Sequence, residues 1–407
     1  MAASESHGHR GEGAGDGRDR SATRARPTTE SPWAGRVWFA VAAIALLVVM
    51  PLLLSDFRLN LMAKFLCFAI IAVGIAFAWG KGGMLTLGQG VFFGLGGYSV
   101  AMFLKLEEAG PGQLPDFMVW SGVEELPVLW KPFQHAWFAL PAAVLLPMGI
   151  AAVLGVLVFR QRVRGAYFAI LTQALAAAFV IFLIGQQQLT GGTNGLTNIR
   201  AMFNLDLANA GNQRGLYVIV AAVLGAAFLL VRHLSRSRYG RLLVAVRDSE
   251  DRVRFLGYNP TTVKVIAFSV SAGLAGLAGA FFVPIVGIIS PTMLGIVPSI
   301  EMVIWVALGG RASLVGAVVG ALVVSWAKTG LSEQFPSGWL YLEGALFIAV
   351  VTFAPKGIAG LGELWRRRTD DRSEGSAPPL VPSPLRHLPG LSSGRGASEK
   401  LEREPSA

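Results

Sequence analysis

Cysteine is almost absent from the sequence, since Cys67 is the only one among 407 residues. A single thiol excludes a disulfide within the chain, and because Cys67 lies inside an apolar run we interpret it as a small buried residue. Charged residues are also scarce, at 15%, whereas 53% of the residues are hydrophobic and the mean hydropathy is +0.54. These proportions exclude an ordinary soluble globular protein and indicate an all-α, polytopic transmembrane bundle.

Signatures of catalysis are missing as well. The sequence has no HExxH, GxSxG or CxxC motif, and its five histidines are scattered over the tails and loops. The string closest to a Walker A motif, WGKGG at 79–83, lacks the Ser or Thr that the motif requires. We therefore expect no catalytic residue, no metal site and no ATP hydrolysis by this route, which disfavours an intramembrane enzyme.

The net charge of +10 could point to nucleic acid, but the arginines cluster between apolar runs and in the tails. No basic face interleaved with aromatic residues appears, so no nucleic-acid partner is expected. Clusters of arginine between apolar runs are instead typical of the cytoplasmic loops of membrane proteins. The expected partner of the apolar runs is the lipid bilayer.

Apolar runs of nearly 20 residues recur along the chain, and this is the length that crosses about 30 Å of hydrocarbon. We predict about ten spans: 37–54, 60–80, 83–104, 137–159, 165–185, 215–231, 261–289, two within 298–328 separated by GGRAS at 309–313, and 339–354. Arginines before the first run and at 366–368 then place both termini in the cytoplasm. If 298–328 were one tilted helix, the count would fall to nine and the C-terminus would change sides.

Three regions follow from this pattern. Residues 1–35 and 363–407 lack apolar runs and are expected to be disordered cytoplasmic tails, and the first is not expected to be a signal peptide. The membrane domain, 36–362, is expected to have an acidic external loop at 105–136 and a basic cytoplasmic loop at 232–258. The predicted location is the cell membrane, with multiple spans.

The basic loop has a pattern of its own. Residues 232–257 carry seven arginines and cannot lie in hydrocarbon. Leu242, Val246, Val253 and Leu256 nevertheless recur at roughly helical spacing with charged residues between them. This periodicity favours a short amphipathic helix that fits a groove on a soluble partner, and a solvated loop is the alternative that periodicity alone leaves open.

Inside the predicted spans, glycine and a few polar residues stand out. The strings MLTLGQGVFFGLGGY (84–98) and SAGLAGLAGAFF (271–282) are expected to pack helices closely. Polar groups in hydrocarbon need partners or water. We therefore predict that these polar residues line a pathway. Glu301 has an alternative interpretation, in which it lies at the external end of its span and reaches water there. The candidate residues are Thr86, Gln89, Thr172, Gln173, Thr193, Asn194 and Glu301.

Four strings, GMLTLGQGVFFGLGGY, LTGGTNGLT, RYGRLLVAVRDSEDRVRFLGYNPTTVKVIAFSVSAGLAGLAGA and IEMVIWVALGGRASLVGAVVGA, occur in this order. They resemble the permease subunits of branched-chain amino acid ABC importers, over roughly Val37 to Leu361. The resemblance implies that the basic loop holds a coupling helix that docks on a separate ATPase subunit. The positions assigned to this role are Leu243, Val246, Arg247, Asp248, Glu250, Leu256 and Gly257.

Within the family, the segments at 114–133, RVRGAYFAILTQALAAAF and DSEDRVRFLGYNP are similar to the second permease subunit of urea importers. The implied partners are a second permease subunit, two ATP-binding subunits and an extracytoplasmic substrate-binding protein, and this chain itself is expected to bind no cofactor. Urea requires amide, hydroxyl and carboxylate partners, which the candidate pathway residues supply. A branched-chain amino acid remains the alternative substrate. A secondary transporter or channel is disfavoured, because it usually shows several intramembrane charges.

Overall fold

The computed structural model describes residues 45–163 and 165–334, together with isolated positions between 338 and 360. Within this part of the chain, six helices are long and apolar enough to cross a membrane: Asp56–Lys81 (α3, Asp56–Ile75, continued by η2, Ala76–Lys81), Ala136–Arg160 (α6), Ala166–Gly185 (α7), Ala210–Arg236 (α9), Pro260–Val286 (α12) and Leu314–Ser332 (within α14, Leu314–Gln334). Two further helices, α4 (Gln89–Ala109) and α13 (Ile296–Gly309), complete the bundle. Residues 37–44 of the first predicted span, most of the tenth span and both predicted tails lie outside the described residues.

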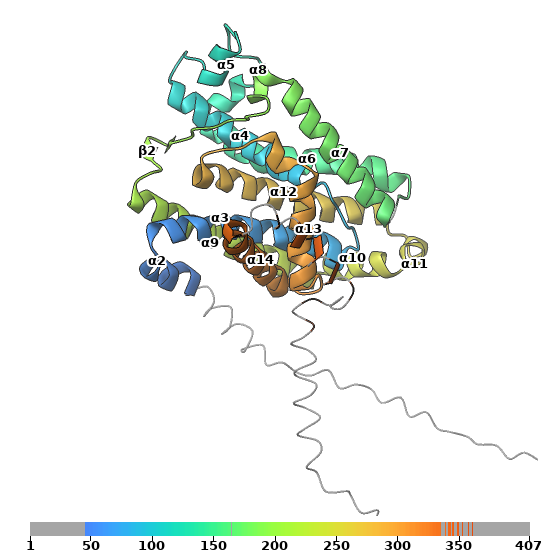
Figure 1. Cartoon of the computed structure of the whole chain (residues 1–407). Coiled ribbons are helices and arrows are strands. Elements are labelled where there is room, and N and C mark those ends of the chain that lie inside the picture. The colour runs from blue at the N-terminus through green and yellow to red at the C-terminus, as the bar shows by residue number, and fades with distance from the viewer. Residues whose placement is uncertain are drawn as a thin grey trace, which may run out of the picture.

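Short elements connect these helices. They are η1 (Ala45–Val49), α2 (Met50–Leu53), α5 (Asp116–Trp120), η3 (Lys131–Gln134), α8 (Gln187–Thr190), the antiparallel strands β1 (Ala201–Met202) and β2 (Leu205–Asp206), α10 (Arg238–Asp248), α11 (Glu250–Phe255) and η4 (Pro291–Leu294). Figure 1 shows α10 and α11 at one end of the bundle and α2 and β2 at the opposite end. We call the first of these the α10 end; its assignment to the cytoplasm remains a prediction.

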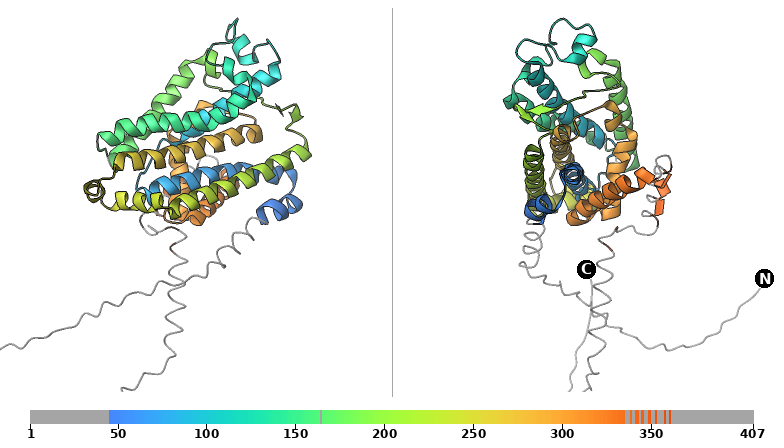
Figure 2. Two further views of the ribbon diagram at one scale, coloured as in Figure 1. Left: turned by 180° about the vertical axis from the view of Figure 1, so that it is seen from behind. Right: turned by 60° about the vertical axis from the view of Figure 1, so that its left-hand side comes forward.

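The centre of the bundle is α12, which packs against α3, α4 and α6, while α3 also packs against α9 and α14. Figure 2 shows α6, α12, α3 and α9 stacked nearly parallel in its left-hand view. The most apolar windows of α3 with η2 and of α12 are 78% and 72% buried, compared with 28% for α7. The protein therefore surrounds α3 and α12 with its own helices and leaves α7 at the periphery.

Glycines bring α4 and α12 into backbone contact, as the sequence predicted. A Cβ atom on Gly96 would collide with the backbone of Gly276, and one on Gly279 would collide with the carbonyl oxygen of Phe93. Small residues allow this approach, which gains van der Waals packing that is unavailable to larger side chains. The two glycine-rich strings thus face each other in the core.

The prediction of one continuous span at 83–104 is wrong. After η2 ends at Lys81, residues 82–88 are not helical, and α4 starts only at Gln89. Gly83 has a φ of +70°, which glycine adopts at no steric cost and other residues rarely adopt. Side chains replace some of the lost helical hydrogen bonds, as irregular backbone at membrane depth requires: the amide of Leu87 donates to Thr172 Oγ1 at 3.0 Å. We call residues 82–88 the helix break.

The predicted break within 298–328 is confirmed, but of the two helices it separates only α14 is long enough to be a candidate span. Helix α13 ends at Gly309 and α14 begins at Leu314, so the chain reverses over the four residues between them. With 14 residues, α13 is about 21 Å long at a rise of about 1.5 Å per residue. This is less than the roughly 30 Å of hydrocarbon. Helix α13 is therefore too short to be a full span by itself.

Candidate functional site

The basic loop forms two short helices instead of one. Helix α10 begins after Ser237, whose Oγ accepts a hydrogen bond from the amide of Gly240 at 3.3 Å, an N-cap that stabilises the first turn. It ends at Asp248, and α11 starts at Glu250 after the extended residue Ser249. The predicted helical character is present, but Ser249 changes the direction of the second half.

Leu243 and Val246 lie on the inner side of α10. Their side chains are 0% and 2% exposed, and Tyr239 Oη donates to the carbonyl of Val263 on α12 at 2.8 Å. Burial raises the pKa of the Tyr239 hydroxyl, so it remains a donor at physiological pH. The predicted contacts of Leu243 and Val246 with a partner therefore need correction, because these side chains anchor α10 to its own membrane domain.

Glu250 is also an anchor. Its Oε2 lies 2.7 Å from Lys264 Nζ on α12, with side chains 5% and 10% exposed, and its Oε1 lies 3.8 Å from Arg254 Nη2. The attraction between the carboxylate and the ammonium offsets part of the free energy that it costs to remove both ions from water. The prediction that Glu250 docks on a partner is corrected accordingly, since its carboxylate is committed to α12.

The exposed part of the loop follows. Asp248 is 61% exposed and pairs with Arg247, and Phe255 and Leu256 are 92% and 75% exposed. Gly257 ends α11 with a φ of +85°, where its amide donates to the carbonyl of Arg254 at 3.0 Å, as in left-handed helix caps. Exposed aromatic and apolar side chains beside charges suit a docking surface. Phe255 was missing from the sequence prediction, because we read the loop as one helix through Ser249.

The helix break brings together three of the predicted pathway residues. Thr86, Gln89 and Thr172 are all buried, at 0%, 0% and 1% exposure. Gln89 Nε2 donates to the carbonyl and the hydroxyl of Ser271 on α12, at 3.0 and 3.1 Å, while Gln89 Oε1 is buried with no hydrogen-bond partner among the described residues. The amide of Gly90 donates to Ser299 Oγ on α13 at 3.2 Å. We call these neutral side chains, Thr86, Gln89, Thr172, Ser271 and Ser299, the amide–hydroxyl cluster.

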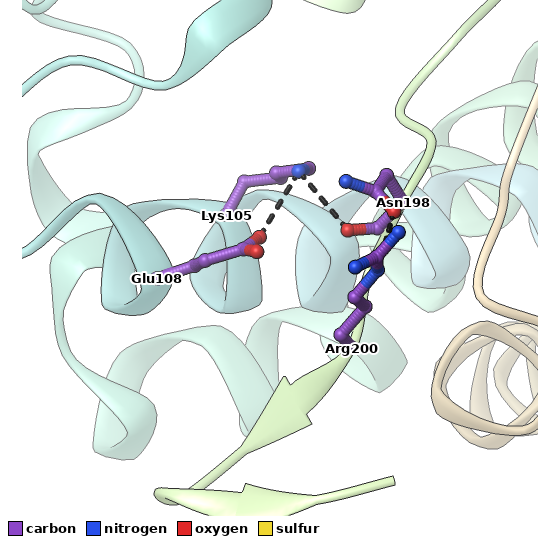
Figure 3. Close-up of polar contacts among 4 residues, drawn as sticks. All are labelled: Lys105, Glu108, Asn198 and Arg200. Atoms are coloured by element: carbon purple, nitrogen blue, oxygen red, sulfur yellow. Dashed lines mark hydrogen bonds and ion pairs between the residues drawn. The ribbon is translucent and has the colours of Figure 1, made fainter. Parts of the chain in front are cut away.

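The other candidates in this group lie elsewhere. Gln173 is half-buried on α7, and Thr193 and Asn194 are exposed in a turn within the segment that follows α8. Lys105, near the end of α4, fixes this segment: its Nζ donates to the carbonyl of Asn198 at 3.3 Å and pairs with Glu108 at 3.0 Å (Figure 3). The structure therefore does not bring all seven predicted residues into one site.

Glu301 forms a second site. Its Oε2 lies 2.5 Å from Lys328 Nζ on α14, and both side chains line a cavity of about 400 Å³. Lys64 on α3, which the sequence analysis did not single out, lines the same cavity with Phe68 and Trp305. Glu301 lies five residues after α13 begins at Ile296, about 8 Å along the helix, and its side chain is only 8% exposed. The structure therefore buries Glu301 in the first half of α13, and its depth in the membrane stays a prediction.

The two sites lie on opposite sides of α13. Ser299 faces Gly90 on α4, whereas Glu301 faces Lys328 on α14. Two residues along an α-helix turn the side chain by about 200°. The neutral cluster at the helix break and the charged cavity are therefore separate environments that share one helix.

Comparison with known proteins identifies the family of the chain. A family model described as "Branched-chain amino acid transport system / permease component" matches residues 57–351. The chain belongs to this permease family. No solved structure matches the chain.

Curated relatives agree with the family. The high-affinity branched-chain amino acid transport system permease protein LivM of Escherichia coli (strain K12) is 25% identical over 342 residues, covering 79% of this chain and 74% of LivM. LivH of Salmonella typhimurium is 24% identical over 314 residues, covering 73% and 92%. The ribose import permease protein RbsC of Escherichia coli (strain K12) is 31% identical over 211 residues, covering 49% and 62%.

These matches and the six apolar helices identify a multi-pass protein of the cell membrane. It is the permease subunit of an ABC transporter of the branched-chain amino acid type, and its relatives are transport subunits, not enzymes. Such a family generally works with ATP-binding subunits, a partner permease and a binding protein.

Proposed function

We propose that this permease forms half of a translocation pathway for urea. One of two ATP-binding subunits would dock on the exposed residues after Ser249, and a second permease subunit would bind the other and complete the pathway. An extracytoplasmic binding protein would deliver the substrate to the end opposite α10. ATP would be bound and hydrolysed by the partners.

The observation that favours urea as the substrate is the amide–hydroxyl cluster at the helix break. Its members are neutral, and the unpartnered Gln89 Oε1 can accept a hydrogen bond from an N–H donor. Urea offers such donors and a carbonyl that accepts from hydroxyl groups, and it carries no charge that would need a counter-ion. The segments at 114–133 and 162–179, which are similar to urea permeases, support the same substrate.

A branched-chain amino acid is the second candidate, favoured by the Glu301 cavity. Glu301 can pair with a substrate ammonium, and Lys64 or Lys328 can pair with a substrate carboxylate, beside aromatic walls that suit an apolar side chain. Against it, Glu301 already pairs with Lys328, so a substrate would have to replace that contact. The names of LivM and LivH favour this candidate as well.

Uptake of labelled urea and labelled leucine by cells carrying Gln89→Leu, Glu301→Gln or the control Ser99→Ala separates the candidates. Ser99 is another buried polar residue of α4, but it bonds only within its helix, to the carbonyl of Leu95 at 2.7 Å. Loss of urea uptake in Gln89→Leu alone supports the proposal. If the unaltered protein takes up no urea and Glu301→Gln loses leucine uptake, the substrate is an amino acid and the urea proposal is wrong.

A further inference from the structure

Arg247 makes a polar contact between α10 and the start of the helix break. Its Nη1 donates to the carbonyl of Gly80 at 2.8 Å, in the last turn of η2. Carbonyls at the end of a helix lack intrahelical donors and attract cations. A charged donor therefore fits this position both as a hydrogen-bond partner and as a charge.

The same side chain is held in place from two further directions. Asp248 Oδ1 accepts from Arg247 Nε at 2.9 Å and lies 2.9 Å from Nη2, which fixes the plane of the guanidinium. The aliphatic part lies against Gly83, where a Cβ atom would be only 2.7 Å from Arg247 Cγ. Arg247 thus contacts the chain just before and just within the helix break.

A cavity lies directly beside this contact. It measures about 400 Å³ and is lined on the loop side by Arg247 and Asp248 and on the bundle side by Met84 and Phe168. Thr172 lies one helical turn beyond Phe168 on the same face of α7. The amide–hydroxyl cluster therefore begins immediately behind the wall that Met84 and Phe168 form.

The other anchors of the loop lead to a different helix. Tyr239 and Glu250 both bind residues of α12, namely Val263 and Lys264. Arg247 differs from these anchors, because its hydrogen bond to Gly80 joins the loop to the chain immediately before the helix break. Since only eight residues lie between Gly80 and Gln89, movement of α10 has a short covalent path to the cluster.

We propose that Arg247 is a positioning residue that transmits movement of the docking loop to the helix break and so opens the wall between the cavity and the amide–hydroxyl cluster. This inference rests on the proposed function, because it assumes an ATPase that moves the loop. When Arg247 holds Gly80 and Gly83, the wall is closed. When the loop is displaced, Met84 follows and the cluster becomes continuous with the cavity.

The test uses the assembled transporter with Arg247→Ala, Arg247→Lys and Arg241→Ala. Lysine retains a charged donor for Gly80, whereas Arg241 is an exposed arginine of the same helix and serves as the control. We expect Arg247→Ala to retain its ATPase subunits but to lose about tenfold or more of substrate-stimulated ATP hydrolysis, the scale of one hydrogen bond to a charged group. Arg247→Lys should restore a large part of it, and Arg241→Ala should match the unaltered protein.

A chemical probe reports on the wall directly. Met84→Cys introduces a thiol at a position that is 5% exposed, while the native Cys67 is fully buried and gives little background. We expect a thiol-reactive sulfonate reagent to modify Met84→Cys about tenfold faster when Arg247→Ala is also present. A merely structural role of Arg247 would not change this rate while leaving the complex assembled.

The outcomes distinguish a failure of the proposed function from a failure of the role proposed for Arg247. If the unaltered permease binds no ATPase subunit, the proposed function fails. If it binds and is stimulated normally, but Arg247→Ala has unchanged stimulation and unchanged modification of Met84→Cys, only the role of Arg247 is overturned. Loss of the ATPase subunits in Arg247→Ala would also overturn it, because Arg247 would then be part of the docking surface.

Discussion

The pairing of Glu250 with Lys264 makes a prediction that differs from the interpretation of the sequence. Both acidic residues, Asp248 and Glu250, were expected to dock on an ATPase, yet their side chains are 61% and 5% exposed. Glu250→Gln leaves the buried ammonium of Lys264 without its closest carboxylate, which costs about 3–5 kcal/mol. Asp248→Asn removes an exposed pair and costs less than about 1 kcal/mol.

The assay is the midpoint of thermal unfolding in detergent, compared at one scan rate because unfolding of such proteins is often irreversible. Glu250→Gln should lower the midpoint clearly, and Asp248→Asn should leave it nearly unchanged. The double variant Glu250→Leu/Lys264→Met should recover much of the loss, since apolar residues of similar volume replace buried ion pairs at little cost. With the matching single variants Glu250→Leu and Lys264→Met, the four proteins form a double-mutant cycle, and the deviation from additivity reports the coupling of the pair.

One result would refute the reasoning. If Glu250→Gln unfolds at the same temperature as the unaltered protein but no longer retains its ATPase subunits, then Glu250 faces the partner and the ion pair with Lys264 does not hold α11. The original interpretation of the sequence would then be correct for this residue.

Two further predictions concern the docking surface and the core. Because Phe255 and Leu256 are 92% and 75% exposed, Phe255→Ser/Leu256→Ser should weaken retention of ATPase subunits in a pull-down at an unchanged unfolding midpoint, and a lower midpoint would show that they pack internally. Gly279→Leu should abolish folding, because even its Cβ atom would collide with the carbonyl oxygen of Phe93, whereas the control Gly149→Leu, with open space around it, should give a normal monodisperse peak in size-exclusion chromatography. A monodisperse Gly279→Leu protein would contradict the close approach of α4 and α12.

Hydropathy was sufficient for the helices but not for the helix break. The window at 137–159 differs from α6 by one residue at each end, and the window at 165–185 differs from α7 by one residue at its start, because a span is defined by the length of its apolar run. Residues 82–88 are also apolar enough to continue a span. The break in the helix depends on glycine conformation and on the hydrogen bond that the amide of Leu87 donates to Thr172 on α7. Thr172 is far from the break in the sequence.

The loop illustrates a similar limit. Helical periodicity correctly indicated an amphipathic segment, but Val246 and Val253 face the protein's own bundle instead of a partner. The turn at Ser249 also starts a new helix with its own phase. Leu256 therefore points outward and Glu250 inward. For Glu301 the sequence supplied the residue, whereas its partners Lys64 and Lys328 depend on how α3 and α14 pack around α13.

The most direct test of the central claim is purification of this permease from its native membrane, with its partners identified and their ATP hydrolysis measured. We predict that ATP-binding subunits and a second permease co-purify, and that a urea-loaded binding protein stimulates hydrolysis while a leucine-loaded one does not. Stimulation by leucine alone would contradict the urea proposal. The absence of any ATPase partner, together with uptake that a proton ionophore abolishes while ATP is maintained, would contradict the ATP-driven mechanism.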